Sequence, residues 1–313
     1  MRLTRRLLLG AALGGMLTAC RLGNDAGAVV WFRMGLGLYR NGMNDSAVAA
    51  FSKAIKLAPY YGPAYNFRGL AYRQLGRWDD AERSFRAALT LGVDSALIMN
   101  NLGLLFLDQN DTTAGLDALN NALRINPRLA AALTNRGRLR RMRGQWYDAL
   151  ADLNAALLQR PNDPIARNQR GLVFYGLANF DSAVANFQAA VHDSATFKQA
   201  FLNLAVSYDS LANWNAAIAA YTDAIALDPG DGVSFNNRGF DYKQKGDWTH
   251  AVADYTTALK IDSSDVTVLN NRGTAYAKLG DRPRARADFQ HVLRIATDRA
   301  NIRYAREQLA KLR

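Results

Sequence analysis

Residues 232–265 read GVSFNNRGFDYKQKGDWTHAVADYTTALKIDSSD, and residues 266–299 read VTVLNNRGTAYAKLGDRPRARADFQHVLRIATDR. Both stretches have 34 residues and share an Asn-Asn-Arg-Gly segment, a tyrosine three residues after it and an alanine at position twenty. The same period extends back to residue 28 without insertion or deletion. It divides the chain into eight repeats: 28–61, 62–95, 96–129, 130–163, 164–197, 198–231, 232–265 and 266–299. A fixed period of this length is typical of a repeat array.

Each repeat carries small and large residues at constant positions. The eighth residue is glycine in seven repeats and alanine in the sixth, and large residues recur at positions eleven and twenty-four. In the second half, apolar residues follow helical spacing, as at Ala251, Tyr255 and Ala258. We expect two helices per repeat, with small residues allowing close approach and large ones filling the space between the helices.

In its period and in nearly all of these positions, the chain resembles the tetratricopeptide repeat over residues 28–299 of 313. The resemblance implies an all-α fold: a right-handed superhelical solenoid of eight helix-turn-helix units, whose first helices line a concave groove. Residues 300–313 leave the pattern. Their apolar face of Ile302, Ala305, Leu309 and Leu312 predicts a C-terminal capping helix, because the end of a solenoid needs a polar outer face.

The start of the chain resembles a bacterial lipoprotein signal. A basic segment precedes an apolar run that is too short to span a bilayer, and Leu17-Thr18-Ala19-Cys20 resembles a lipobox. This resemblance implies a signal peptide over 1–19, a diacylglycerol and an N-acyl lipid on Cys20, and a short linker up to residue 27. Arg21 stands where Asp would favour retention at the inner membrane, so the outer membrane facing the periplasm is favoured. Export by the Sec route or the twin-arginine route is left open.

Position seven is arginine in five repeats: Arg68, Arg136, Arg170, Arg238 and Arg272. In those repeats position twenty-three is Ser, Asp or Asn, whereas the three repeats with Met or Leu at position seven have Ala at position twenty-three. The two positions therefore vary together within one chain. We expect each arginine to bind the residue at position twenty-three of its own repeat, because a partly buried arginine without an acceptor is costly.

Position six carries a second polar series: Asn101, Asn135, Asn203, Asn237 and Asn271. Asparagine is a poor residue inside a helix, so its repeated use indicates a further requirement. By resemblance to tetratricopeptide proteins, these amides form a ladder in the groove that holds the main chain of a bound peptide. In the alternative interpretation they bridge adjacent repeats, because buried amides usually find partners within the chain.

Composition limits the chemistry that the chain can perform. Cys20 is the one cysteine, and the three histidines lie far apart at His192, His250 and His291. The sequence shows no phosphate-binding loop, metalloprotease motif or nucleophile elbow, so we expect neither an enzyme nor a cofactor other than the lipid. The formal net charge of +12 favours anionic partners. Nucleic acid is not expected, because the ladder of stacking aromatic and basic residues found in single-strand binders is missing.

These observations predict a lipid-anchored scaffold of the bacterial envelope. It would bind extended or helical peptide segments of other proteins in its groove and assemble a periplasmic complex, for cell-wall remodelling, outer-membrane assembly, or pilus or secretion assembly. The alternative is an envelope protein that binds peptidoglycan or another polyanion through basic surfaces, such as Arg138 and Arg141 or the segment 281–313.

Overall fold

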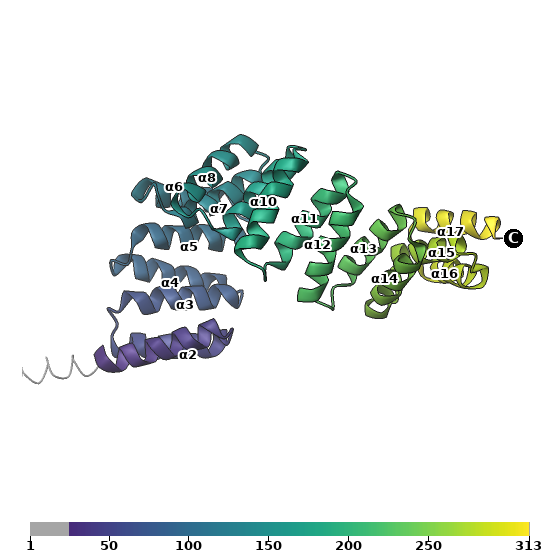
Figure 1. Cartoon of the computed structure of the whole chain (residues 1–313). Coiled ribbons are helices and arrows are strands. Elements are labelled where there is room, and N and C mark those ends of the chain that lie inside the picture. The colour runs from purple at the N-terminus through teal and green to yellow at the C-terminus, as the bar shows by residue number, and fades with distance from the viewer. Residues whose placement is uncertain (1–24, 313) are drawn as a thin grey trace, which may run out of the picture. The chain divides into compact units, whose positions relative to one another are not determined.

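The computed structural model describes residues 25–312, and every regular element within them is an α-helix (Figure 1). The predicted signal peptide, Cys20 and most of the predicted linker lie outside the described residues. Contacts divide the chain into two compact bodies, which meet in the sequence between Gln159 and Arg160. The expectation of an all-α array of helix pairs is confirmed.

The N-terminal body contains a helix over 25–40 followed by α2 (Asn44–Leu57), α3 (Gly62–Gln74), α4 (Trp78–Thr90), α5 (Ser95–Asp108), α6 (Thr112–Ile125), α7 (Ala130–Met142) and α8 (Trp146–Gln159). The C-terminal body contains α9 (Pro164–Gly176), α10 (Phe180–Asp193), α11 (Lys198–Ser210), α12 (Trp214–Leu227), α13 (Gly232–Gln244), α14 (Trp248–Ile261), α15 (Val266–Lys278), α16 (Arg282–Ile295) and α17 (Arg299–Lys311). The helices follow the repeat period, with one first helix and one second helix in each repeat.

Each repeat is a helical hairpin closed by a short turn. A residue in the left-handed region ends this turn: Gly246 and Gly280 have φ of 77° and 80°, and Ala178 and Ala212 occupy the equivalent place. A polar side chain then caps the second helix, as where Asp247 accepts a hydrogen bond from the His250 amide at 3.1 Å. Local sequence therefore sets both ends of the turn.

The two helices of a hairpin approach closely at position eight. A Cβ atom placed on Gly171 would lie 2.6 Å from Cε1 of Phe187, and one on Gly239 would lie 2.9 Å from Cε1 of Tyr255. The rings of Phe187 and Tyr255 are completely buried. Glycine therefore makes room for the large residue of position twenty-four, as the sequence predicts.

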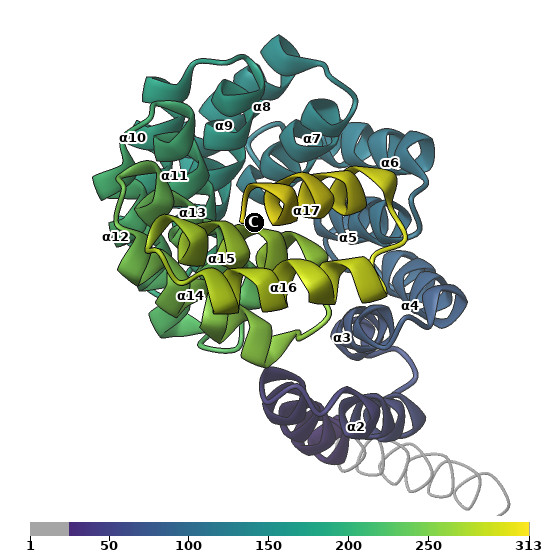
Figure 2. The ribbon, with the colours of Figure 1, turned by 90° about the vertical axis from the view of Figure 1, so that its right-hand side faces the viewer.

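First helices of successive repeats also touch one another. In the N-terminal body α3 contacts α5 and α5 contacts α7; in the C-terminal body α9 contacts α11, α13 contacts α15, and α15 contacts α17 (Figures 1 and 2). Among the described repeats, no two second helices approach each other as closely. Within each body the first helices therefore lie on the inner side of the stack, and the second helices lie on the outer side.

Helix α17 covers the last hairpin, as expected for a cap. Ala305 and Leu312 are buried against α15 and α16, and Leu309 packs beside them. Asp298 caps the start of α17 by accepting a hydrogen bond from the Asn301 amide at 2.8 Å. Ile302, predicted on the same apolar face, is half-buried and lies beside Arg303 and Arg306 on the open side of the helix.

Candidate peptide-binding surface

Side-chain amides link the first helices of neighbouring repeats. Asn203 on α11 donates a hydrogen bond from Nδ2 to Oδ1 of Asn168 on α9, over 2.8 Å. The same bond, from position six to position five of the preceding repeat, joins Asn101 to Asn66 (2.9 Å), Asn135 to Asn100 (2.8 Å) and Asn271 to Asn236 (3.3 Å). The structure thus gives these amides the bridging role that was one of the two interpretations of the asparagine series.

Asn237 departs from this arrangement, because the preceding repeat has Leu202 at position five and offers no acceptor. Its Oδ1 instead accepts a hydrogen bond from Nδ2 of its neighbour Asn236, at 3.5 Å. At the C-terminal end, Asn270 donates from Nδ2 to Oδ1 of Asn301 at 2.9 Å. The amide series therefore reaches the capping helix.

A primary amide has two N–H donors and one acceptor oxygen, so a single bridge leaves part of its capacity unused. Asn101 is 5% exposed and is enclosed by its neighbours. Four others are half-buried and keep contact with solvent: Asn135, Asn203, Asn237 and Asn271. Oδ1 of Asn203 also accepts a hydrogen bond from Gln199 at 3.1 Å. Within this series, the amides that solvent and a ligand can reach are thus the half-buried ones.

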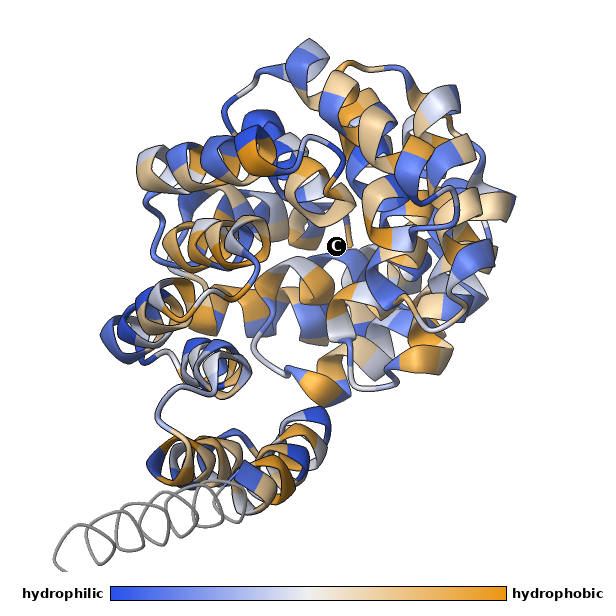
Figure 3. Cartoon of the chain, turned by 90° about the vertical axis from the view of Figure 1, so that its left-hand side faces the viewer, coloured by the Kyte–Doolittle hydropathy of each residue, from blue (hydrophilic) through white to orange (hydrophobic). Residues whose placement is uncertain are grey.

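Apolar side chains at position nine share the helix face of these amides, because they lie three residues further along the helix. Leu172 on α9 and Val206 on α11 are half-buried, and Phe240 on α13 is 37% exposed. Lys243 places its Nζ 4.9 Å above the Phe240 ring. Figure 3 shows that apolar and polar residues alternate along the helices of both bodies. First helices of the C-terminal body therefore present amides next to apolar side chains.

The arginines at position seven bind position twenty-three of their own repeat, as predicted. Arg136 and Asp152 form two bonds, of 2.9 Å from Nε to Oδ2 and 2.7 Å from Nη2 to Oδ1. Nε of the remaining arginines donates to position twenty-three in Arg68–Ser84 (3.2 Å), Arg170–Asn186 (2.7 Å), Arg238–Asp254 (2.8 Å) and Arg272–Asp288 (2.9 Å). We call each of these contacts an arginine clasp. The clasps stabilise the framework between helices, and their arginines do not belong to a ligand site.

A third partner of the clasps was not predicted. Nη1 of Arg136 donates to Asn120 at 2.9 Å, and Nη1 of Arg238 donates to Thr222 at 2.9 Å. Both acceptors lie at position twenty-five of the preceding repeat, and Ser52 and Thr256 play this part for Arg68 and Arg272. The only sequence signal is that position twenty-five is polar in these repeats, which is ordinary for a helix surface.

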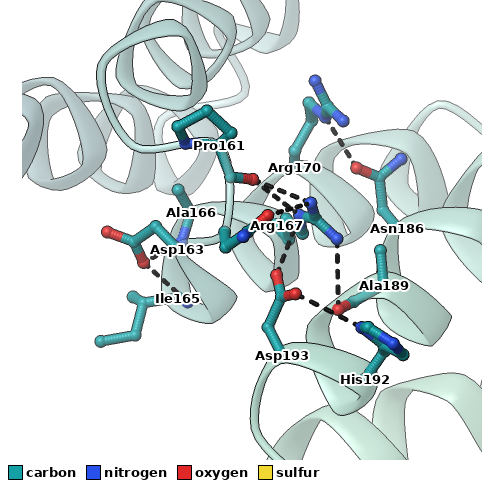
Figure 4. A network of polar contacts seen from close by, with 11 residues as sticks. Pro161, Asp163, Ile165, Ala166, Arg167, Arg170, Asn186, Ala189, His192 and Asp193 are labelled. Carbon is teal, nitrogen blue, oxygen red and sulfur yellow. Dashed lines mark hydrogen bonds and ion pairs between the residues drawn. The ribbon is translucent and has the colours of Figure 1, made fainter.

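A second polar network braces the beginning of the C-terminal body (Figure 4). Arg167 on α9 donates from Nη2 to the carbonyl of Pro161 at 2.8 Å and from Nη1 to the carbonyl of Ala189 at 3.3 Å (Figure 4). Its Nε lies 3.1 Å from Oδ2 of Asp193. Arg167 thereby connects the segment before α9 with the end of α10, so it also belongs to the framework.

The basic cluster on α7 is only partly available to partners. Arg140 lies 2.8 Å from Oδ2 of Asp152 and so joins the Arg136 clasp. Arg141 is half-buried; this burial, and then the charge of Arg138, lower the pKa of the Arg141 guanidinium. Arg138 and Arg143 are exposed. Of the two arginines expected to reach the groove, Arg138 is the one that solvent freely reaches.

Two carboxyl groups are buried inside the C-terminal body. Asp241 on α13 is completely buried and lies beside the Asp209 carboxyl group, to which it can donate a hydrogen bond when it is protonated. Burial, and then the negative charge of Asp209, raise the pKa of Asp241 to about 8. Asp209 on α11 accepts a hydrogen bond from the Tyr221 hydroxyl at 2.9 Å, and burial raises the pKa of Asp209 as well. Sequence reasoning missed this pair, although Asp241 occupies position ten, where most repeats carry an apolar or small residue.

Within residues 25–312, no three His, Cys, Asp or Glu side chains gather where they could hold a metal ion. In the same part of the chain, none of the helices combines the length and the apolar character that crossing a bilayer requires.

Family models of the tetratricopeptide repeat match most of the chain. One matches overlapping segments at 32–96, 68–131, 100–164, 134–191 and 168–232. A second, described as TPR repeat, matches 239–280, and a third, again described as tetratricopeptide repeat, matches 266–298. No curated protein sequence matches the chain.

Solved structures share the fold at low sequence identity. YrrB, described as a TPR protein with an unusual peptide-binding site, is 19% identical with a TM-score of 0.56, covering 61% of this chain and 99% of YrrB. A tetratricopeptide repeat protein from Parabacteroides merdae is 22% identical with a TM-score of 0.53, covering 80% and 98%. A monomeric IFIT1 mutant with Gppp-AAAA is 19% identical with a TM-score of 0.61, covering 86% and 72%. The repeats, their helical hairpins and the family matches together show that this chain belongs to the tetratricopeptide-repeat family.

Proposed function

We propose that the chain is a non-catalytic scaffold that binds extended or helical peptide segments of other proteins along its first helices. Tetratricopeptide-repeat proteins are generally scaffolds of this kind, and the similar protein YrrB is described as having a peptide-binding site. The observation that carries the proposal is the row of half-buried amides Asn203, Asn237 and Asn271 beside the apolar side chains Val206 and Phe240.

The chemistry of this row suits a peptide main chain. Each amide offers an N–H and an oxygen that can pair with extended backbone whatever its side chains are. Val206 and Phe240 supply apolar surface for side chains of the bound segment, and such anchors provide most of the binding energy in peptide recognition. Lys243 adds a positive charge beside Phe240. The preferred segment therefore carries apolar anchors and a nearby acidic residue.

The two roles of the amides can be separated by a matched pair of variants. Asn203→Ala and Asn168→Ala both remove the 2.8 Å bridge between α9 and α11. Asn203 is half-buried on the inner surface, whereas Asn168 is 3% exposed and out of reach of a ligand. Crosslinked pull-downs from bacterial envelopes should lose a specific partner with Asn203→Ala and keep it with Asn168→Ala. Equal losses with both variants would contradict a ligand role for Asn203.

Phe240→Ala gives an independent measurement, because this side chain is 37% exposed and its truncation leaves the hairpin core intact. We expect the same partner to be lost, while the melting temperature of the chain falls by only about 2–4 °C, because the ring also packs edge-on against Trp214. A partner retained by Phe240→Ala and by Asn203→Ala would place its binding site elsewhere on the molecule.

We further propose that a lipid on Cys20 anchors the scaffold in the bacterial envelope, at the outer membrane facing the periplasm, where it assembles a protein complex. The lipobox-like segment Leu17–Cys20 supports this proposal, and two or more acyl chains provide stable anchoring. Metabolic labelling with a palmitate analogue should label the wild type and not Cys20→Ser. The variant should also move from the membrane fraction to the soluble fraction. An unlabelled wild type would overturn the lipid anchor without affecting the scaffold.

Binding of peptidoglycan or another polyanion is the second candidate. It is favoured by the exposed arginines on the open side of α17, Arg299, Arg303 and Arg306, and by Arg138 on α7. Binding through exposed charges weakens steeply with salt, whereas an apolar peptide contact does so only slightly. Sedimentation with purified peptidoglycan at rising salt, compared between wild type and Arg299→Ser/Arg303→Ser/Arg306→Ser, distinguishes the two candidates.

A further inference from the structure

The third repeat lacks the arginine clasp. Leu102 on α5 occupies position seven and Ala118 on α6 occupies position twenty-three, and both are buried. In the clasped repeats the guanidinium lies between two successive second helices, because it binds its own second helix and the one before it. Replacing the arginine with leucine therefore removes side-chain atoms from the outer side of the stack.

A notch opens at this place, between α4 and α6 and above α5. Its volume is about 570 Å³, and its apolar wall includes Leu89, Met99, Leu102, Phe106 and Ala118. The equivalent notch of the eighth repeat contains Arg272 at position seven and has a volume of about 200 Å³. Six repeat positions line both notches, including position seven; the notch of the third repeat extends further, to Phe106, Ala114, Asp117 and Ala118. The notch that has leucine in place of the arginine is thus the larger of the two, and its volume falls within the range of about 300–1,000 Å³ typical of ligand pockets.

The sixth repeat provides an internal comparison, since it also has leucine and alanine at these positions, Leu204 and Ala220. There Gln188 donates a hydrogen bond to the Tyr208 hydroxyl at 2.7 Å, which connects two walls of the notch. In the notch of the third repeat, Arg86 and Phe106 occupy these two positions, and they cannot form this bond. In the third repeat, therefore, no arginine clasp fills the notch, and the bond that joins its walls in the sixth repeat is missing.

The rim of the notch carries one unneutralised charge. On the α4 side, Nη2 of Arg86 lies 2.5 Å from Oε1 of Glu82, one turn earlier on the same helix. On the α6 side Asp117 is exposed and has no ion-pair partner among the described residues. A ligand that placed a cation next to its apolar group would pair with Asp117, whereas an anion would be repelled. This local preference is opposite to that of the whole chain, whose net charge is +12.

We propose that the notch between α4 and α6 is a second docking site, on the outer side of the N-terminal body. It binds a large apolar side chain of a partner protein that is flanked by lysine or arginine. The apolar side chain fills the space left by the missing guanidinium, above Leu102, and the neighbouring cation pairs with Asp117. This site is independent of the inner surface, so a partner bound there leaves the first helices free for a second protein.

Methyl NMR tests the site directly, because Met99 lines the notch and is half-buried. The full chain is labelled with ¹³C at the methionine methyl groups, and Met99→Leu assigns the Met99 resonance. We expect this resonance to shift saturably with the amidated peptide Lys-Trp-Lys. The amidated peptide Glu-Trp-Glu should bind about two- to fivefold more weakly, which is the effect of one exposed ion pair. Asp117→Asn should remove most of this difference.

The decisive variant installs the clasp of the other repeats. Leu102→Arg/Ala118→Asp copies Arg238 and Asp254, fills the notch, and should abolish the Met99 shift. If circular dichroism shows that the double variant is unfolded, Ala114→Phe replaces it in the test, because a phenylalanine on α6 obstructs the same notch. The matched control, Leu204→Arg/Ala220→Asp in the sixth repeat, should leave peptide binding unchanged. An unshifted Met99 resonance in the wild type, or an equal shift in a folded chain with a filled notch, would overturn the proposal.

Discussion

Arg238 on α13 and Asp254 on α14 face each other through two parallel hydrogen bonds, each 2.8 Å long. A third bond, from Nη1 of Arg238 to Thr222 on α12, measures 2.9 Å. The hydrogen bond to Asp254 is the main cause of the raised pKa of Arg238, whereas burial lowers this pKa. One guanidinium thus connects three successive helices of two repeats, with side chains that are only 16% and 8% exposed.

Removing Arg238 alone should be far more harmful than removing the whole clasp. Arg238→Leu leaves the Asp254 carboxylate buried without a counter-ion, which costs about 3–5 kcal/mol of unfolding free energy. Arg238→Leu/Asp254→Ala recreates the pair found in the sixth repeat, Leu204 and Ala220, so it should recover much of that loss. Urea unfolding of the wild type, both single variants and the double variant gives the coupling energy. Strictly additive losses would show that the clasp does not act as a unit.

The fifth repeat offers a matched comparison, because its acceptor is the neutral Asn186, 2.7 Å from Nε of Arg170. Arg170→Leu leaves an amide rather than a carboxylate behind, and Asn186 keeps its bond to the carbonyl of Ser182 at 2.8 Å. We expect this variant to cost less than Arg238→Leu in the same unfolding experiment, since an unpaired amide is cheaper to bury than an unpaired charge.

The helix pairs and the clasps could be predicted because one chain supplies eight comparable repeats. Covariation of positions seven and twenty-three identified Arg238 and Asp254 as partners without any structure. The contact of Arg238 with Thr222 could not be predicted, since a threonine on a helix surface does not by itself indicate a partner. The bridge from Asn203 to Asn168 stayed undecided, because an amide at either position suits a ligand as well as a neighbouring repeat. The notch above Leu102 depends on side-chain volumes in three helices, which spacing alone does not reveal.

The close approach at position eight predicts a strong effect of one added methyl group. In Gly171→Ala the new Cβ would lie 2.6 Å from the Phe187 ring, which is completely buried and cannot move freely. We expect a loss of about 1–3 kcal/mol of unfolding free energy, which is typical of overpacking. Gly37→Ala is the control, because its Cβ meets no atom within 4 Å in a helical segment. It should stabilise the chain by about 0.5–1 kcal/mol. Equal effects of the two substitutions would contradict this account.

Two hairpin turns carry backbone strain that glycine would relieve. Ala178 and Ala212 have φ of 56° and 53°, at the turn position where five other repeats have glycine. A left-handed residue with a Cβ costs about 1–2 kcal/mol. After allowance for the greater freedom of glycine in the unfolded chain, Ala178→Gly and Ala212→Gly should each raise the unfolding free energy by about 0.5–1 kcal/mol. Gly246→Ala should lower it, and calorimetric melting of the three variants checks both directions.

Asp241 predicts a pH dependence opposite to that of a usual salt-bridged aspartate. The pKa of Asp241 in the folded chain is raised from its ordinary value of 3.8 to about 8, mainly by burial and then by the negative charge of Asp209. Between these pH values the folded chain holds a proton that the unfolded chain releases, so the unfolding free energy falls as pH rises. The contribution of protonated Asp241 to the unfolding free energy is fully present below pH 4 and is lost by about pH 8. Carboxyl groups with lowered pKa values, such as Asp228 and Asp247, act in the other direction but only near and below pH 4.

Asp241→Asn isolates this effect, because an amide keeps the shape of the protonated carboxyl group and does not titrate. Near pH 5 the variant and the wild type should have similar stability. Above pH 5, the unfolding free energy of the variant should increase progressively relative to that of the wild type, and the difference between the two should level off above about pH 8. Urea unfolding followed by tryptophan fluorescence at five pH values measures the difference, since Trp214 and Trp248 stand at the starts of α12 and α14. The exposed Asp228 supplies the control, and Asp228→Asn should show no such trend between pH 5 and pH 9. A difference between Asp241→Asn and wild type that stays constant across this range would mean that Asp241 is ionised in the folded chain throughout, which would require a counter-charge beside its buried oxygens.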